Sequence, residues 1–366
     1  MAEDTDTVKT IGPDDIPVIE PKTCAPENAA SLAKPSRISG FLLQKRPSAQ
    51  IFSKQRMNNT SNVENNSSCK DIDNFKTSIY VPTYIIVFIF GFIENVISLY
   101  VLLKLYKRKT AMTIVMANLA TSDLLFVCTL PLRVHYYSKN VWIFTDSLCL
   151  FLTYALYLNM YCSIYFLTLM SILRYFAIVH PIKCLKYRSV KYVQIICISI
   201  WAFVGIATIP VLIDSSEINR ARCFELKHKS TLFVMNLISL PVGCIIPFFI
   251  ITVSYILVVK TLLTSKAKHH RQTSSRRKAS AMIFIVTIIF LTSFLPYHIL
   301  RTVYLGLTSH ARCLVQKGAV VTLCTAAINS CLDPLLYYFA AENFRDKLRS
   351  TVKNTFKGCP ALMHQT

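Results

Sequence analysis

The sequence lacks the residue patterns that enzymes and metal proteins need. Its histidines, among them His180 and His298, are not paired with cysteines or carboxylates at metal-ligand spacing. No serine or cysteine has an evident general base on a shared helix face. These absences argue against catalysis by a bound metal or by an activated nucleophile, and we expect that the protein is not an enzyme.

Acidic residues are also scarce. The 366 residues include 19 Asp and Glu against 40 Lys and Arg, a formal net charge of +21, although 53% of the residues are hydrophobic. This pairing is unusual for a soluble domain, and the apolar and basic residues occupy separate parts of the chain. We expect the basic residues to form a rim that faces membrane lipid, and we expect no nucleic-acid partner.

Seven long apolar blocks occupy most of the chain after Tyr80. Each exceeds the roughly 20 residues needed to cross a ~30 Å hydrocarbon core, and such spans must be helical because lipid cannot hydrogen-bond the backbone. The blocks are Tyr80 to Leu105, Met112 to Tyr137, Leu148 to Val179, Tyr192 to Ile213, Leu232 to Leu263, Ala279 to Leu305 and Val315 to Phe339. The sequence therefore predicts an all-α membrane protein, a seven-transmembrane helix bundle. A short amphipathic helix is expected at 342–352.

Basic residues fix the expected topology. They crowd the connections after the first, third and fifth spans and the segment after the seventh, so these faces are predicted to be cytoplasmic. We expect a multi-pass plasma-membrane protein with three parts: an extracellular, glycosylated, largely disordered N-terminus (1–78), a seven-transmembrane domain (79–341), and a cytoplasmic amphipathic helix with a tail (342–366). Residues 1–56 contain no signal-peptide pattern, so the first span is expected to act as the signal anchor.

The polar segment before the first span carries extracellular marks. Glycosylation acceptor patterns begin at Asn58, Asn59, Asn65 and Asn66. Four cysteines are predicted on the outer face, where the compartment is oxidising. We predict a disulfide between Cys149 and Cys223 and a second between Cys69 and Cys313.

Polar residues lie singly within the apolar blocks. Asn95, Asp123, Arg174 and Asp333 stand one per span, a pattern typical of signalling or transport machinery. A transporter or channel is disfavoured because the sequence shows no related halves, broken midplane helices or pore-lining polar stripe.

Two arginines near the outer ends of the spans predict an anion site. Arg133 lies about three turns outward of Asp123, and Arg301 lies outward of Pro296. Burying a guanidinium is costly unless something negative meets it, and its forked donors suit carboxylate or phosphate. Hydroxyl and imidazole groups that we expect around them belong to Tyr154, Tyr157, Tyr161, Tyr297, His298 and Tyr304. The alternative is that the arginines reach the membrane surface and the tyrosines are interfacial anchors.

From Cys69 onward the chain resembles the rhodopsin-like G protein-coupled receptors. The marks that carry the resemblance, in chain order, are Asn95, Asn118-Leu-Ala with Asp123, Cys149, Arg174, Trp201, Pro247, Tyr255, Phe294-Leu-Pro296-Tyr and Asp333-Pro334-Leu-Leu-Tyr337. Prolines in the last three spans provide places to bend.

That resemblance implies a mechanism and partners. Activation would swing the sixth helix outward at Phe294 and Pro296, and would free Arg174 to contact a heterotrimeric G protein. Tyr255 and Tyr337 would then turn inward. No cofactor is expected beyond a sodium ion, whose implied ligands are Asn95, Asp123, Ser163, Asn329 and Asp333. Arrestin would be a further partner.

Finer motifs look most like the cysteinyl leukotriene receptors. They are Leu-Pro-Leu-Arg133, Tyr154-Ala-Leu-Tyr157 with Asn159, Tyr161-Cys-Ser-Ile and Leu-Pro296-Tyr-His-Ile-Leu-Arg301-Thr. This resemblance implies an anionic lipid ligand, a Gq-type G protein and calcium release. Nucleotide and lysophospholipid receptors share many of these marks and remain alternatives.

Two positions depart from the receptor pattern. Leu173 stands before Arg174, where most relatives have a carboxylate that restrains the inactive state, and raised basal activity is therefore a hypothesis. Glu94 stands beside Asn95, where glycine is usual. We expect the Glu94 carboxyl to be neutral and hydrogen-bonded, because an unpaired charge inside the bundle is costly.

Overall fold

Seven membrane-length helices make up the described structure and confirm the predicted fold class. The computed structural model describes residues 72–106, 109–180, 189–214, 223–224, 229–264, 270–306 and 312–340, together with Phe344 and Arg349. All of them belong to one compact unit, Arg56–Thr366. The predicted glycosylation sites, Cys69 and most of the predicted amphipathic helix lie outside these residues.

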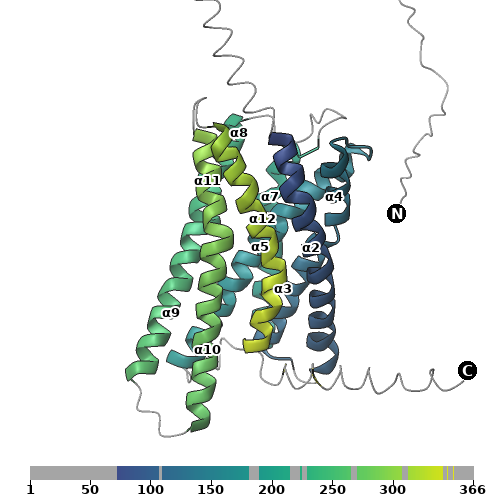
Figure 1. Cartoon of the computed structure of the whole chain (residues 1–366). Coiled ribbons are helices and arrows are strands. Elements are labelled where there is room, and N and C mark those ends of the chain that lie inside the picture. Colours follow the sequence, from purple (N-terminus) through teal and green to yellow (C-terminus); the bar gives the residue numbers. More distant parts are fainter. Residues whose placement is uncertain are drawn as a thin grey trace, which may run out of the picture. The chain divides into compact units, whose positions relative to one another are not determined.

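The spans form from successive helical segments, several of which continue through a π-helical turn (Figure 1). The first span is α2 (Ile72–Tyr100) with η1 (Val101–Leu105), the second α3 (Ala111–Val127) with α4 (Leu130–Lys139), the third α5 (Asp146–Val179) and the fourth α7 (Val190–Asp214). The fifth is α8 (Lys229–Leu240), η2 (Pro241–Ile245) and α9 (Ile246–Thr264), the sixth α10 (His270–Ile289), η3 (Phe290–Phe294) and α11 (Leu295–Gly306), and the seventh α12 (Arg312–Ala340).

The first span begins before the predicted boundary. Residues 72–78 are helical, although the sequence placed them in the N-terminal segment. Asp73 lies in the first turn of α2, where the helix dipole favours a carboxylate. It forms a 3.0 Å ion pair with Lys76, which lies one turn later. Polar residues therefore extend the helix past the apolar block.

The second span is broken where the sequence predicted one continuous helix. Proline at position 131 lies in the first turn of α4, where its missing N–H is tolerated. The Thr129 hydroxyl donates a 2.6 Å hydrogen bond to the Phe126 carbonyl at the break. This break sets the direction of α4 and hence of Arg133.

Two of the three predicted bending prolines lie just after a π-helical turn. Pro247 follows η2 and Pro296 follows η3, and each π turn is closed by an i to i+5 bond, from Ile246 N–H to the Pro241 carbonyl and from Leu295 N–H to the Phe290 carbonyl. Pro334, in contrast, lies inside α12 without interrupting it. A wider turn before a proline relieves the clash of its ring with the preceding turn.

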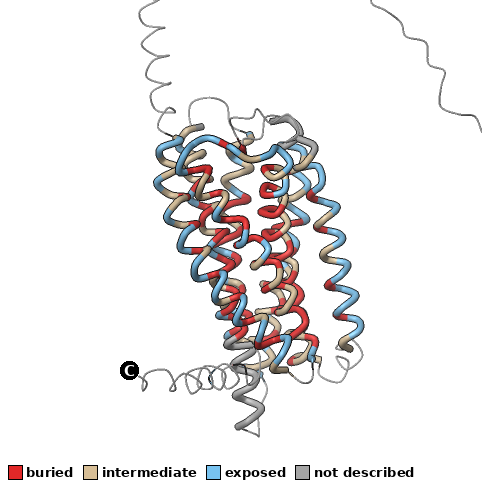
Figure 2. Tube along the Cα trace, turned by 90° about the vertical axis from the view of Figure 1, so that its right-hand side faces the viewer, coloured by how far each residue is buried: buried red, intermediate tan, exposed pale blue. Residues whose placement is uncertain are grey.

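Burial separates the two faces of every helix. Buried residues line the interior of the bundle and exposed ones face outward (Figure 2). The third span, α5, packs against α3, α7, α9 and α10 and supplies much of the core. Between α3 and α7, the Trp201 indole donates a 3.0 Å hydrogen bond to the Asn118 side chain.

The bundle has two ends, one marked by a disulfide and the other by Arg174. The predicted bond between Cys149 and Cys223 is present, with Cα atoms 5.9 Å apart, and it marks the disulfide end. The other end, which holds the last turns of α5, is the Arg174 end. Cys313 is also disulfide-bonded, but Cys69 lies outside the described residues, so their pairing stays a prediction.

Removing the indole N–H should weaken the bundle. We expect Trp201→Phe to lower the thermal unfolding midpoint in detergent by about 2 °C, because a net hydrogen bond contributes about 1 kcal/mol and the Asn118 oxygen loses its donor. Ile206→Leu, on an exposed face of the same helix and outside the apolar cavity, is the control and should leave the midpoint unchanged. An unchanged midpoint in Trp201→Phe would show that the hydrogen bond contributes nothing.

Candidate functional site

Arg301 on α11 is held by tyrosine hydroxyls rather than by a carboxylate. Its Nη1 donates to the Tyr157 hydroxyl at 2.5 Å and to the Tyr297 hydroxyl at 2.6 Å. The guanidinium carbon also lies 5.1 Å from the centre of the Tyr157 ring. Among the described residues no acidic side chain pairs with Arg301. The side chain is thus ordered across α5 and α11 while its positive charge is not neutralised.

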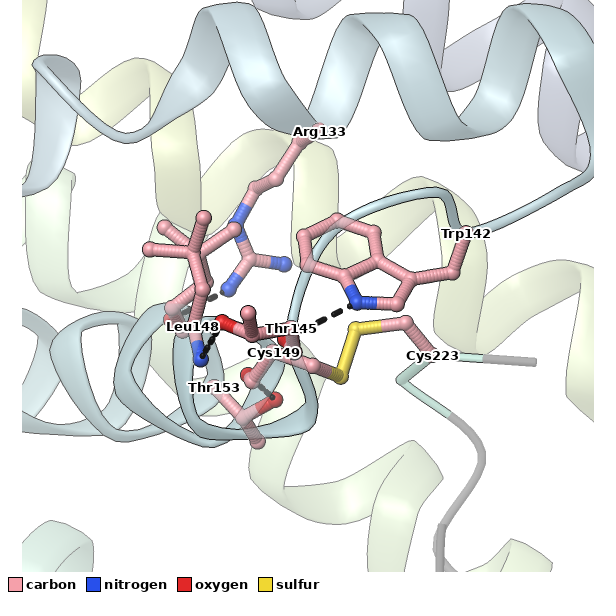
Figure 3. The surroundings of a disulfide bond; sticks show 8 residues. Arg133, Trp142, Thr145, Leu148, Cys149, Thr153 and Cys223 are labelled. Carbon is pink, nitrogen blue, oxygen red and sulfur yellow. Dashed lines mark hydrogen bonds between the residues drawn. A yellow bond between two sulfur atoms is a disulfide. The ribbon is translucent and has the colours of Figure 1, made fainter. Parts of the chain in front are cut away.

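Arg133 on α4 is more deeply buried, at 1% exposure. Its Nη2 donates a 2.6 Å hydrogen bond to the Leu152 carbonyl, and its guanidinium carbon lies 4.3 Å from the centre of the Phe224 ring. Figure 3 shows the side chain directed at the first turns of α5 beside the disulfide. Its Nε has no hydrogen-bond partner among the described residues. Burying a guanidinium with an unused donor is costly unless a negative group meets it.

Phe224 reaches Arg133 because the disulfide holds it there. Cys223 precedes it directly, and Phe224 adopts a positive φ of 68°, which is rare for a residue with a side chain. Its ring lies against Tyr136 and Tyr137 of α4, with ring centres 5.3 and 6.0 Å away. Sequence reasoning missed Phe224, and its position next to a predicted disulfide cysteine was the available signal.

Two cavities adjoin the arginines, and Tyr157 lines both. The first, of about 290 Å³, lies at Arg133 and is largely polar, with Asp73, Lys76, Tyr80, Asn140 and Thr153 in its wall. The second, of about 370 Å³, lies at Arg301 between α5, α7 and α8. Its wall is largely apolar, with Phe203, Val204, Ala207, Met235, Ile238 and Val242. The site thus joins a polar compartment to an apolar one.

The predicted aromatic residues divide into two groups. Tyr161 lines the apolar cavity and lies close against Gly243, where an added Cβ would lie 2.5 Å from its ring. His298 is fully buried, with its ring 5.8 Å from that of Tyr161. Four predicted residues line neither cavity: Tyr154, Tyr297, His298 and Tyr304. The Tyr154 hydroxyl instead donates to the Gly205 carbonyl of α7 at 3.1 Å.

Asn236 is a further polar residue of the apolar cavity that sequence reasoning missed. It is 3% exposed, and its amide nitrogen donates a 2.7 Å hydrogen bond to the Thr302 hydroxyl of α11. Its amide oxygen has no partner among the described residues. A lone asparagine in the apolar fifth block was the signal that would have found it.

A second polar cluster lies in the middle of the bundle. Asn159 donates to one oxygen of Asp123 at 3.0 Å and to the Ser122 hydroxyl at 3.2 Å, and Asn329 donates to one oxygen of Asp333 at 2.8 Å. Asn95 ties α2 to α12 through the Ser330 carbonyl at 2.8 Å. Asn159 was noted only as part of a motif, and the structure makes it the residue that bridges α5 and α3.

Buried oxygens of this cluster suit a small hard cation. Asn95 Oδ1, Asp123 Oδ2, Asn329 Oδ1 and Asp333 Oδ1 are buried and accept no hydrogen bond from the described residues. They belong to four of the five residues implied as sodium ligands. Ser163 meets the cluster through a 3.5 Å contact with the Asn159 amide nitrogen. The donor set is all oxygen, as sodium requires, so the residues present fit the ion.

The Arg174 end holds the residues implied in activation. Arg174 Nε lies 3.4 Å from the sulfur of Met282 on α10, and its neighbour Leu173 is buried at 7% exposure. Tyr255 packs with Val258 and Ile283 in a small apolar cluster between α9 and α10. Tyr337 is fully buried with its hydroxyl unpartnered among the described residues, and the ring of Phe344 packs 6.4 Å from its own.

Glu94 was expected to be a neutral, hydrogen-bonded carboxyl. Its Oε2 is buried and has no partner among the described residues. The residue is partly buried and lies beside the inward-facing Asn95 on α2. We have no physical account of why this position is a glutamate.

Comparison with known sequences gives the class of this protein. The sequence profile of the seven-transmembrane receptors of the rhodopsin family matches residues 94–337. The chain belongs to this family and is a G protein-coupled receptor, not an enzyme.

Particular relatives narrow the resemblance. The chain is 42% identical to human cysteinyl leukotriene receptor 2 over 321 residues, which cover 86% of this chain and 91% of the relative. It is 44% identical to cysteinyl leukotriene receptor 1 of Sus scrofa over 313 residues, 81% of this chain and 92% of the relative. The human uracil nucleotide/cysteinyl leukotriene receptor is 35% identical over 280 residues, 74% and 75% of the two chains.

The oxygen cluster generates a prediction about cations. We expect 150 mM NaCl to raise the thermal unfolding midpoint of the purified chain by about 2 °C over choline chloride, because an ion at about tenfold its dissociation constant stabilises by about 1.4 kcal/mol. Asp123→Asn should abolish the difference while keeping the acceptor for Asn159. A sodium effect of equal size in that variant would refute a site at Asp123.

Proposed function

We propose that this receptor binds an anionic lipid mediator of the cysteinyl leukotriene class and signals through a Gq-type G protein to calcium release. The observation that carries the proposal is Arg301, whose charge is oriented by two tyrosine hydroxyls but paired with no carboxylate among the described residues. A ligand carboxylate supplies the missing charge. The names of the relatives support the ligand class.

The two compartments match the two halves of such a ligand. A carboxylate at Arg301 receives hydrogen bonds from the guanidinium and from Tyr157 and Tyr297. The long hydrocarbon tail enters the apolar cavity beside Tyr161, where burial stabilises it by about 0.8 kcal/mol per CH₂. The peptide-bearing portion extends past Tyr157 toward Arg133, whose Nε, without a partner among the described residues, donates a hydrogen bond to a second carboxylate.

The apolar cavity also supports entry from the membrane. Three residues of its wall are outward-facing: Phe203 is 51% exposed, Ile238 63% and Val242 38%. They come from α7, α8 and η2, so the gap between the fourth and fifth spans faces lipid. A lipid ligand dissolved in the bilayer reaches the cavity by this route without crossing water.

A nucleotide is the second candidate. The polar cavity combines Arg133 with Lys76, and one relative is named for uracil nucleotides as well as cysteinyl leukotrienes. Against it, Lys76 already pairs with Asp73 at 3.0 Å, and the second cavity offers a phosphate or a ribose mostly hydrocarbon. We therefore rank the lipid first.

The proposed topology places the disulfide end outside the cell and the Arg174 end in the cytoplasm. It rests on the basic residues that follow the odd-numbered spans. In the proposed activation step, ligand binding shifts the sixth span outward about η3, and Arg174 exchanges its contact with Met282 for the G protein. A ligand drives this shift only through a higher affinity for the active state.

Loss of the Arg301 charge should lower the potency of the ligand. In cells expressing the chain, we expect a cysteinyl leukotriene to release calcium and Arg301→Gln to raise the half-maximal concentration by about 100-fold, the equivalent of about 2.7 kcal/mol for a buried charge pair. Tyr304→Phe, one turn further along the same helix but outside both cavities, should behave as the unsubstituted chain. Surface expression must match in all three.

Competing ligands separate the outcomes. A calcium response to uridine nucleotides with none to leukotrienes would keep the receptor and overturn the ligand. A leukotriene response that survives in Arg301→Gln would keep the ligand class and overturn the anion site.

Leu173 predicts activity without ligand. Because no carboxylate precedes Arg174, we expect a calcium-linked signal above mock-transfected cells at matched surface expression, and we expect Leu173→Asp to reduce it by at least half. Inositol phosphate accumulation measures this signal. Equal signals in expressing and mock cells would refute raised basal activity.

A further inference from the structure

A third cavity lies at the Arg174 end, remote from both arginines of the ligand site. Its volume is about 650 Å³, larger than the two cavities described above. It forms where the end of the first span, at η1, separates from the first turns of α3 and α7. The proposed ligand and G protein make no use of it.

The floor of this cavity is fixed by a hydrogen bond between helices. Asn118 lines the cavity and accepts the 3.0 Å bond from Trp201, which holds α3 against α7. In the π-helical turn η1, Leu102 faces the interior of the bundle and is 1% exposed, whereas Leu103 faces outward and is 46% exposed. The three helix ends therefore leave a hollow between them rather than a packed seam.

The wall is apolar and opens to the lipid-facing surface. Ile114 and Ala117 of α3 form the inner side, and Ile195 and Ile198 of α7 form the outer side. Ile195 is 59% exposed and Ile198 67%. A hydrocarbon chain in the bilayer has direct access to this surface.

Two lysines, Lys109 and Lys191, line this cavity. Lys109 directly precedes Thr110, the N-cap residue of α3, and Lys191 is the second residue of α7. Because both helices begin at the Arg174 end, the two ammonium groups lie where a span meets the lipid headgroups. Both side chains are exposed, and among the residues that the structure describes no acidic side chain lines the cavity.

We propose that this cavity binds an anionic glycerophospholipid of the leaflet at the Arg174 end. Its headgroup phosphate and carboxylate lie between Lys109 and Lys191, and an acyl chain lies along Ile114, Ile195 and Ile198. Charge complementarity selects the class of lipid, because a sterol or a zwitterionic phospholipid leaves two neighbouring ammonium groups without an added negative charge. The bound lipid joins three spans at the point where they diverge.

Native mass spectrometry of the full chain in detergent tests the headgroup. We expect dioleoyl phosphatidylserine to bind at least tenfold more tightly than dioleoyl phosphatidylcholine, which has the same acyl chains. Lys109→Gln and Lys191→Gln should each weaken phosphatidylserine about fivefold and the double variant about 30-fold, as expected for the loss of one surface cation each. Lys260→Gln, an exposed lysine near the same end but outside the cavity, is the matched control.

A second variant tests the cavity itself. Ile195→Trp fills part of the cavity while keeping both lysines, and it should weaken the binding of phosphatidylserine about tenfold. If Ile195→Trp binds like the unsubstituted chain, or if Lys260→Gln loses as much affinity as the double variant, the lysines act only as diffuse surface charge and the proposal is overturned.

Two competitors identify the occupant. Soluble glycerophosphoserine, which is the headgroup without acyl chains, should fail to displace the lipid at a hundredfold excess. Displacement of phosphatidylserine by glycerophosphoserine would assign the cavity to a soluble anion. Displacement by cholesteryl hemisuccinate, equally effective in the unsubstituted chain and in the double lysine variant, would assign it to a sterol. The thermal unfolding midpoints without added lipid should agree within about 2 °C across the variants, which confirms that each is folded.

Discussion

The absence of hydrogen-bonding partners in the bilayer constrains every part of this structure. A backbone amide or carbonyl in hydrocarbon must be satisfied within the protein, so an interruption of a span requires a local substitute. At the break between α3 and α4 the Thr129 hydroxyl donates a hydrogen bond to the Phe126 carbonyl. At η2 the Tyr165 hydroxyl donates a 3.0 Å hydrogen bond to the Val242 carbonyl. These interruptions shape the site, because the first directs Arg133 and the second opens the wall beside Gly243.

The two arginines follow from the same constraint with different solutions. Arg133 is enclosed by a carbonyl and an aromatic face, both of which interact with a cation without cancelling its charge. Arg301 is held by hydroxyls, which are equally neutral. A carboxylate in either place would have been the stronger partner in isolation, but it would also have removed the charge that an anionic ligand needs. The cost of leaving both unneutralised is therefore consistent with a binding role.

Most of the fold was predictable because the length and hydrophobicity of the spans decide it. The break at Pro131 was missed because proline is tolerated in the first turn of a helix, and only the tertiary structure shows that α4 begins there. Within the site, Arg133, Tyr157, Tyr161 and Arg301 were predicted from their place near the outer ends of the spans and from the resemblance to known receptors, and each of them lines a cavity. Tyr154 and Tyr304 line neither cavity, because a few tens of degrees around a helix separate a cavity wall from a neighbouring helix. Phe224 follows the predicted disulfide cysteine Cys223, which was the available signal, but its contact with Arg133 also depends on a positive φ that the sequence does not reveal.

The proposed anion site and the proposed bend of the sixth span lie on one continuous helix. His298 Nδ1 donates a 2.9 Å hydrogen bond to the carbonyl of Phe294, the last residue of η3, and Phe290 in the same turn stacks on Phe248 of α9 with ring centres 5.5 Å apart. Arg301 lies one turn beyond His298 and ties α11 to α5 through Tyr157. An anion that accepts hydrogen bonds from Arg301 competes directly with that tie. Under the proposed function, the ligand therefore acts on the α5 to α11 contact at a site within two helical turns of η3, and no longer chain of contacts is needed to reach the bend.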